Sequence, residues 1–263
     1  MPTTVQPNRK ERRDAARRER VEREAARAAA TARRRRLARL GAVLAGAALV
    51  VAVLVVVSGS GSGTKPAART AASGPVAGAR ETSALLAGIP QHGLTLGRPK
   101  APVRVVEFAD LQCPFCRDYS TGVLPRLVRT YVRPGKVRME FRSLHFIGPD
   151  SERAARVVQA AGRQDKLWNV LDLAYRSQGK ENSGWATDAL LRRLAGAVPG
   201  LDVGRVFAAR DSAAVTAELK AANTLATTSG VQSTPTFLVG RGSSLKAVDA
   251  AGLPAAIEAA VGR

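Results

Sequence analysis

The sequence predicts an α/β domain with a long helical segment in its middle, preceded by a single transmembrane helix. Two observations predict the domain. Short β-branched apolar runs alternate with helical patterns from about residue 91 onward, and the region of about 151–229 is almost entirely helical in pattern. A third observation predicts the membrane helix, because residues 40–57 contain no charged or strongly polar side chain. The chain therefore divides into residues 1–39, 40–57, 58–90 and 91–263.

Residues 1–39 are strongly basic, and we interpret them as a cytoplasmic tail. The chain has 41 Lys and Arg against 21 Asp and Glu, and its first 39 residues hold 14 of the former and 5 of the latter. A basic excess is also typical of nucleic-acid-binding proteins, but the sequence has no recognisable DNA- or RNA-binding motif, so we expect no nucleic-acid partner. Acids, bases and alanines mix there without an apolar stripe, which indicates a solvated, partly helical segment rather than a coiled coil.

Residues 40–57, LGAVLAGAALVVAVLVVV, are predicted to be a single-pass signal anchor. These 18 residues just suffice to cross a hydrocarbon core of roughly 30 Å as a helix. A cleaved signal peptide is the main alternative, but its apolar region would be about 7–15 residues long, and the following SGSGSGTKPAART has no convincing A-x-A site. The sequence leaves open whether the anchor is later cleaved. Arginines directly before residue 40 predict a cytoplasmic N-terminus and an extracytoplasmic domain.

Residues 58–90 are expected to form a flexible linker, because they are rich in Gly, Ser, Ala and Pro and show no pattern that could bury a core. The domain that follows is predicted to consist of a strand, a helix, a strand, several helices, two strands and a final helix. The helical residues Trp168, Leu171, Leu173 and Tyr175 are predicted to lie in its core. The predicted elements, in order, are APVRVVEFAD, DYSTGVLPRLVRTYV, KVRMEFRSL (136–144), the helices of 151–229, TPTFLVG (234–240), LKAVD and LPAAIEAAVG.

The only two cysteines, Cys113 and Cys116, stand where a predicted strand meets a predicted helix. A zinc site needs four ligands, or three and a water, and the two histidines, His92 and His145, lack the spacing to complete one. A structural disulfide across so short a loop would stabilise the fold little. A redox-active pair fits best, because the N-terminus of a helix favours the thiolate of the first cysteine.

Two segments, EFADLQCPFC and VQSTPTFLVG, together resemble the DsbA-like thiol–disulfide oxidoreductases, a group with a thioredoxin fold and an inserted helical domain. The resemblance covers about residues 91–263, with the insertion at about 151–229. It implies an enzyme without a cofactor of its own that introduces disulfides into exported proteins with free thiols. It also implies reoxidation by a membrane partner of the DsbB or vitamin K epoxide reductase type.

The resemblance also implies roles for seven residues. Cys113 matches the exposed nucleophilic cysteine and Cys116 its more buried partner, while Pro114 and Phe115 are the intervening pair that tunes the redox potential. The remaining matches are Thr234 and Pro235, which correspond to the cis-proline loop beside the active-site disulfide, and Glu107, which corresponds to the acidic residue that helps move the proton of the buried thiol.

Two of these residues also carry expectations of their own. Apolar neighbours of Glu107 indicate a buried strand, where desolvation would raise its pKa. Phe115 stands where the strongest oxidants of the family have histidine, so we expect the pKa of Cys113 to be less depressed than the value of about 3.5 known for DsbA. Phe115 would also add apolar surface for gripping unfolded substrates.

Two alternative functions remain at this point. The first is a disulfide reductase, which uses the same residues with the opposite net flow of electrons. The second is a tethered binding module whose cysteine pair is a static disulfide. The sequence does not determine the direction of electron flow, the natural substrates, the redox partner or the oligomeric state.

Overall fold

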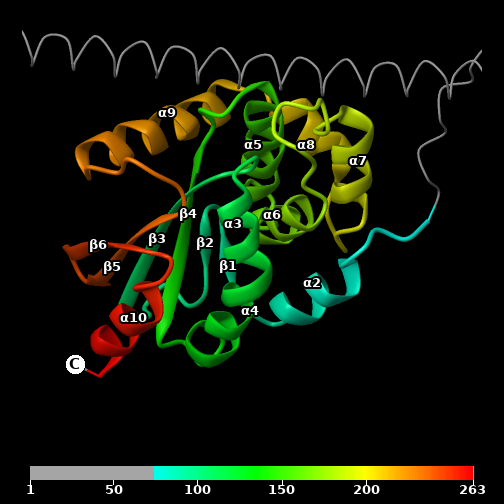
Figure 1. Ribbon diagram of the computed structural model, residues 1–263. Helices are drawn as coiled ribbons and strands as arrows, with labels where there is room; N and C mark the ends of the chain where they lie inside the picture. Colours follow the sequence, from blue (N-terminus) through cyan, green and yellow to red (C-terminus); the bar gives the residue numbers. More distant parts are fainter. Residues whose placement is uncertain (1–73, 263) are drawn as a thin grey trace, which may run out of the picture. The chain divides into compact units, whose positions relative to one another are not determined.

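A six-stranded mixed sheet organises the residues that the computed structural model describes, 74–262 (Figure 1). Its strand order is β1-β2-β4-β3-β5-β6. The two central strands, β3 and β4, pair in parallel, and all other neighbours pair antiparallel. The strands are β1 (Gln91–His92), β2 (Thr95–Leu96), β3 (Val103–Asp110), β4 (Val137–Leu144), β5 (Thr236–Arg241) and β6 (Ser244–Asp249).

Strand β3 leads directly to the cysteines and is buried on both faces. Its β-branched apolar residues form the continuous run that is typical of a strand covered on both sides. Because successive side chains point to opposite faces, Val106 and Phe108 pack toward helix α9 (Ala213–Thr228), while Val105 and Ala109 face the larger core. Glu107 shares the face of Val105, so its carboxyl group points into that core.

The helices lie on both faces of the sheet, and the inserted helices α5 to α8 gather at one side of it (Figure 1). The order of elements predicted from the sequence is confirmed from β3 to the C-terminus. Strands β1 and β2 were not predicted, since two residues are too few to show a period. The inserted helices are α5 (Pro149–Gly162), α6 (Leu167–Arg176), α7 (Asp188–Gly196) and α8 (Val203–Ala209); α9 returns to the sheet, and α10 (Leu253–Val261) closes the chain.

The helix that follows the cysteines continues past Pro125 and contains two π-helical segments, whose turns are wider than those of an α-helix. It runs as α3 (Pro114–Asp118), a π-helical segment η1 (Tyr119–Val123), α4 (Leu124–Leu127) and a second π-helical segment η2 (Val128–Val132). In η1 the N–H of Leu124 donates to the carbonyl of Tyr119, five residues back. Pro125 has no N–H to donate, and a π-turn is a common place for a helix to accommodate such a break.

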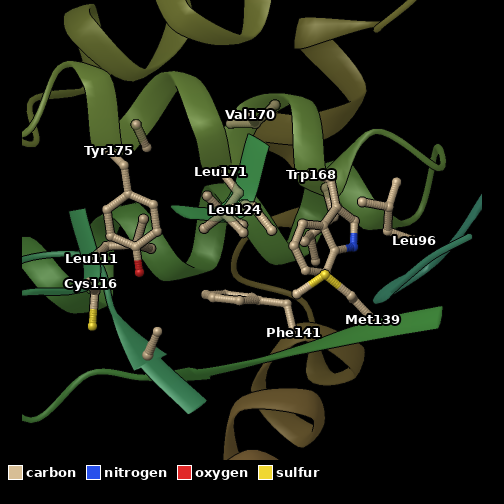
Figure 2. Close-up of a cluster of buried hydrophobic side chains, with 14 of the residues drawn as sticks. Leu96, Leu111, Cys116, Leu124, Met139, Phe141, Trp168, Val170, Leu171 and Tyr175 are labelled. Atoms are coloured by element: carbon tan, nitrogen blue, oxygen red, sulfur yellow. The ribbon is translucent and has the colours of Figure 1, made fainter. Parts of the chain in front are cut away.

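The large core contains the predicted helical residues of α6 and reaches the second cysteine (Figure 2). Trp168 is 1% exposed, its indole N–H donates to the carbonyl of Leu94 at 3.1 Å, and its ring meets Phe141 edge-on at 6.2 Å. Tyr175 lies at the end of the same helix, near Cys116 at the edge of the cluster. The inserted helices and the two cysteines therefore share one core.

The predicted linker 58–90 is wrong at its C-terminal end. Residues Ala79–Leu86 form helix α2, which buries Leu85 and Leu86 against the core. Thr82 donates to Asp172 of α6, and the guanidinium of Arg133 donates to the carbonyls of Leu85 and Ala87, both at 2.8 Å. The stabilising contacts come from distant residues, so the composition of the segment alone did not reveal them.

Within residues 74–262, no helix is long and apolar enough to cross a membrane. The predicted signal anchor, 40–57, and the basic tail, 1–39, lie outside the described residues.

Candidate active site

The N-terminus of α3 places the two cysteines. Cys113 is the N-cap residue with extended backbone, and Pro114 takes the first helical position, where no N–H is needed. The N–H of Cys113 donates to the carbonyl of Asp110 at 3.1 Å, and its own carbonyl accepts from the N–H of Arg117 at 3.2 Å. Cys116 follows one turn later, inside the core. The sequence therefore folds so that one sulfur sits at the tip of the helix and the other beneath it.

Both cysteines are free thiols, and they differ in burial. Cys113 is 5% exposed and Cys116 is fully buried. The prediction that Cys116 is the more buried partner is confirmed. The prediction of an exposed Cys113 is wrong in degree, because the loop before β5 covers most of this side chain.

The loop before β5 carries the predicted cis-proline. The peptide bond between Thr234 and Pro235 is cis, and Pro235 is buried. The Cys113 thiol donates to the carbonyl oxygen of Thr234 at 3.3 Å. The two sequence segments, 121 positions apart, are thus in contact, as the resemblance implied.

The surroundings drive the pKa values of the two thiols apart. A hydrogen bond from the Cys116 thiol, helped by the backbone N–H groups of Phe115 and Cys116, lowers the pKa of Cys113 from 9.0 to about 6. Burial, and then the neighbouring Cys113 sulfur, raise the pKa of Cys116. Phe115 contributes only its backbone, and the pKa of Cys113 stays above the value of about 3.5 given by a histidine-containing centre, as expected.

We expect the reduced protein to show a thiolate transition near pH 6 in its absorbance at 240 nm. The same group should contribute stability that is fully present above pH 9, decreases as the pH falls from 9 to 6, and is absent below it, because its pKa is lower in the folded state. Urea unfolding of the reduced chain at pH 5, 7 and 9 measures this contribution. The Cys113→Ser variant serves as the control and should lose both effects. A transition near pH 9 in the native protein would contradict the expectation.

Glu107 is buried, as predicted. It is 1% exposed, and its Oε2 atom has no hydrogen-bond partner among residues 74–262. Burial raises the pKa of Glu107 from 4.5 to about 8, so the carboxyl group is mostly protonated at pH 7. Its paired neighbours across the sheet are Phe141 and Phe237, which keep water away. A neutral carboxylic acid in this place can give or take a proton.

The sequence analysis missed Asp110, which shapes the turn between β3 and the cysteines. This carboxylate is fully buried and accepts three hydrogen bonds, from the N–H of Gln112 at 2.8 Å, the hydroxyl of Ser151 at 2.5 Å and the N–H of Ile147 at 3.2 Å. The available signal was an acidic residue at the end of an apolar strand, three positions before Cys113.

The sequence analysis also missed two residues of the helical insertion. The side-chain amide of Gln178 donates to the carbonyls of Leu111 at 2.8 Å and Cys113 at 3.1 Å. The hydroxyl of Tyr175 donates to the carbonyl of Asp110 at 3.3 Å. No local pattern could have revealed Gln178, because it follows α6 and lies 65 positions beyond Cys113 in the sequence.

Two exposed phenylalanines and a hollow lie near the two segments that form the site. Phe115 is 71% exposed, which agrees with the prediction of apolar surface at the mouth, and Phe146 is 65% exposed. Phe146 borders a hollow of about 360 Å³ between the end of β4, the C-terminal part of α9 and residues 231–233, directly before Thr234. The hollow is lined by Leu144, Phe146, Asn223, Ala226, Thr227, Val231, Gln232 and Ser233.

Comparisons with known proteins agree with this geometry. A family model described as Thioredoxin matches residues 91–259. The Probable disulfide bond formation protein D of Bacillus cereus is 42% identical over 112 residues, which are 41% of this chain and 52% of that protein. The match spans about half the length of such curated relatives.

Two solved structures share the fold. Oxidised BdbD from Bacillus subtilis is 23% identical with a TM-score of 0.58, covering 66% of this chain and 98% of that one. A thioredoxin-like oxidoreductase from Silicibacter pomeroyi is 28% identical with a TM-score of 0.53, covering 70% and 98%. Since the family model matches more than half of its residues, the chain belongs to the thioredoxin family, and it carries a helical insertion between β4 and β5.

Proposed function

We propose that this protein is a membrane-tethered, extracytoplasmic thiol–disulfide oxidoreductase that introduces disulfides into exported proteins. The observation that carries the proposal is the difference between the two thiols at the tip of α3. Cys113 has a pKa of about 6 and borders the Thr234 carbonyl, whereas Cys116 is fully buried with a raised pKa. The name of the Bacillus cereus relative, Probable disulfide bond formation protein D, supports the formation of disulfides rather than their reduction.

In the proposed reaction the enzyme starts with a Cys113–Cys116 disulfide. A substrate thiolate attacks the sulfur of Cys113 and forms a mixed disulfide, while Cys116 leaves as a thiolate and takes up a proton that Glu107 supplies. A second substrate thiolate then attacks the substrate sulfur of this mixed disulfide. Cys113 leaves readily because its thiolate is stabilised. Two electrons have passed from the substrate to the enzyme, and a membrane partner of the DsbB or vitamin K epoxide reductase type would remove them.

The apolar surface beside the site suits an unfolded substrate. Phe115 and Phe146 could hold apolar side chains, and the hollow next to residues 231–233 could take a chain that runs past Thr234. Apolar contacts of this kind do not require a particular substrate sequence, so they would suit a broad set of exported proteins. Anchoring by residues 40–57 would keep the domain close to the outer face of the membrane.

A reductase is the second candidate, because a pKa of about 6 stabilises the Cys113 thiolate less than the histidine-containing centres do. The reduction potential of the full chain separates the two. A value near roughly −120 mV supports an oxidase, and one near roughly −270 mV supports a reductase.

A trapping variant tests the proposal as a whole. We expect Cys116→Ala, expressed in the native cell envelope, to accumulate mixed disulfides between Cys113 and exported proteins, visible as reducible high-mass species in the membrane fraction. The double variant Cys113→Ala/Cys116→Ala is the control and should trap nothing. If no adduct forms and the native cysteine pair resists reduction by glutathione, the protein is a binding module with a static disulfide.

A further inference from the structure

Tyr119 has a buried hydroxyl without a hydrogen-bond partner among the described residues. The side chain is 3% exposed, although a buried tyrosine hydroxyl normally finds a partner. Leaving such a group unsatisfied destabilises the folded state. A phenylalanine would fill the same space without this cost, so the hydroxyl has no evident structural purpose.

One contact and two alignments relate Tyr119 to both the buried thiol and the buried carboxyl group. It follows Cys116 by three residues on the same helix, so the two side chains share a face. Its ring packs against Phe237 with centroids 4.7 Å apart. Phe237 is the direct partner of Glu107 in the ladder between β5 and β3, and directly opposed side chains point to the same face.

The electrostatics agree with this placement. Burial raises the pKa of Tyr119, and the next causes are the charges of Glu107 and Cys116. The phenol therefore stays protonated over the whole working range, and it interacts with both groups. Glu107 also has an oxygen without a partner among residues 74–262, and it holds a proton at pH 7.

We propose that the hydroxyl of Tyr119 passes the proton between Glu107 and Cys116, which makes it a proton relay for the buried half of the redox centre. The idea rests on the proposed function. When the Cys116 thiolate leaves the disulfide, the phenol gives its proton to the sulfur and receives one from the Glu107 carboxylic acid. Tyr119 ends unchanged, Cys116 is a neutral thiol and Glu107 a carboxylate. No electrons move in this step, and the reverse sequence deprotonates Cys116 before it attacks.

The other ionisable groups around Cys116 have hydrogen-bond partners of their own, and for Cys113 one of them is Cys116 itself. The Tyr175 hydroxyl, from α6, donates to the Asp110 carbonyl. The Asp110 carboxylate, from β3, accepts three hydrogen bonds. Cys113, from α3, is bonded to Thr234. Ser120 is also buried with a hydroxyl that lacks a partner in the described part of the chain, so it enters the test as a rival.

The decisive reaction is the reduction of the Cys113–Cys116 disulfide by dithiothreitol, because Cys116 must leave in it whichever direction the enzyme favours. The rate would be measured on the full chain from pH 5.5 to 9 and corrected for the dithiothreitol thiolate present. In the native protein we expect the corrected rate to fall above about pH 8, where Glu107 has lost its proton.

We expect Tyr119→Phe to slow this reduction by roughly tenfold or more at pH 7 and to remove the fall near pH 8. Glu107→Gln should slow it similarly, and the double variant no further, because both residues serve one transfer. The melting temperature of Tyr119→Phe should stay the same or rise. The surface tyrosine offers a matched control, so Tyr131→Phe should keep the pH profile.

A Tyr119→Phe variant with the native rate and profile would overturn the inference. So would a slower variant that keeps the fall near pH 8 and melts earlier, since that pattern is a packing defect. Loss of the profile in Ser120→Ala alone would assign the transfer to the serine instead. If the native pair cannot be reduced at all, the proposed function itself is wrong.

Discussion

Disulfide transfer is expected to be abolished in Cys113→Ser, with a loss of at least about a thousandfold, as for other removed nucleophiles. A serine hydroxyl does not ionise in the working range, and its oxygen cannot form a mixed disulfide. The hydrogen bond from Cys116 and the backbone N–H groups at the helix tip, which lower the pKa of Cys113 to about 6, would then have no thiolate to stabilise. Oxidation of a peptide with two cysteines, followed by mass spectrometry, measures the loss.

Cys116→Ser is the informative comparison for this variant. It removes the second sulfur but keeps the one that substrates reach, so its Cys113 thiolate should attack a peptide that already contains a disulfide, form a mixed disulfide and stop there, because no second enzyme thiol resolves it. If neither Cys113→Ser nor Cys116→Ser forms a mixed disulfide with the peptide, the attack does not occur at Cys113. If Cys113→Ser keeps any disulfide transfer above the uncatalysed rate, the assignment of the nucleophile is wrong.

Asp110→Ala is expected to lower the free energy of unfolding by about 3–5 kcal/mol, the largest effect on stability that we predict. The change leaves the buried donors of Gln112 and Ser151 and the half-buried N–H of Ile147 without their acceptor, and each buried loss costs about 1–3 kcal/mol. Urea unfolding of the reduced chain at pH 7 measures the difference. The loosened turn should also raise the pKa of Cys113 toward 9.0, since the Asp110 carbonyl orients its backbone.

Asp118→Ala provides the matched control. Asp118 lies on the same helix as the cysteines, but its side chain is 64% exposed and pairs only with the adjacent Arg117 among the described residues. Exposed pairs contribute roughly 0–1 kcal/mol, so this variant should unfold almost like the native protein. Equal stability of the two alanine variants would show that the hydrogen bonds of Asp110 do not matter.

The fold could be predicted largely from local patterns. The run from Val103 to Asp110 is apolar and β-branched because β3 is covered on both faces, and such strands are visible in sequence. Helix α2 was missed because its stability comes from Asp172 and Arg133, which lie far along the chain. The strands β1 and β2 are held by their neighbours in the sheet rather than by a pattern of their own.

The residues of the site also divide into those that the sequence reveals and those that it does not. Cys113, Cys116 and Pro235 could be identified because short motifs carry them, and the burial of Glu107 followed from its apolar neighbours. Asp110 and Tyr119 stood next to the motif, but their importance depends on which atoms have partners, which a sequence does not state. Gln178 could not be found at all, because only the packing of the insertion brings it to the cysteines.

The amide of Gln178 has a consequence for how such proteins can diversify. It binds the carbonyl of Cys113, so the dithiol is framed partly by a segment outside the thioredoxin core. A mutation in that segment can therefore shift the electron affinity of the centre while the Cys-Pro-Phe-Cys sequence stays intact. Substitutions in the helical insertion could therefore change the reduction potential of this protein during evolution.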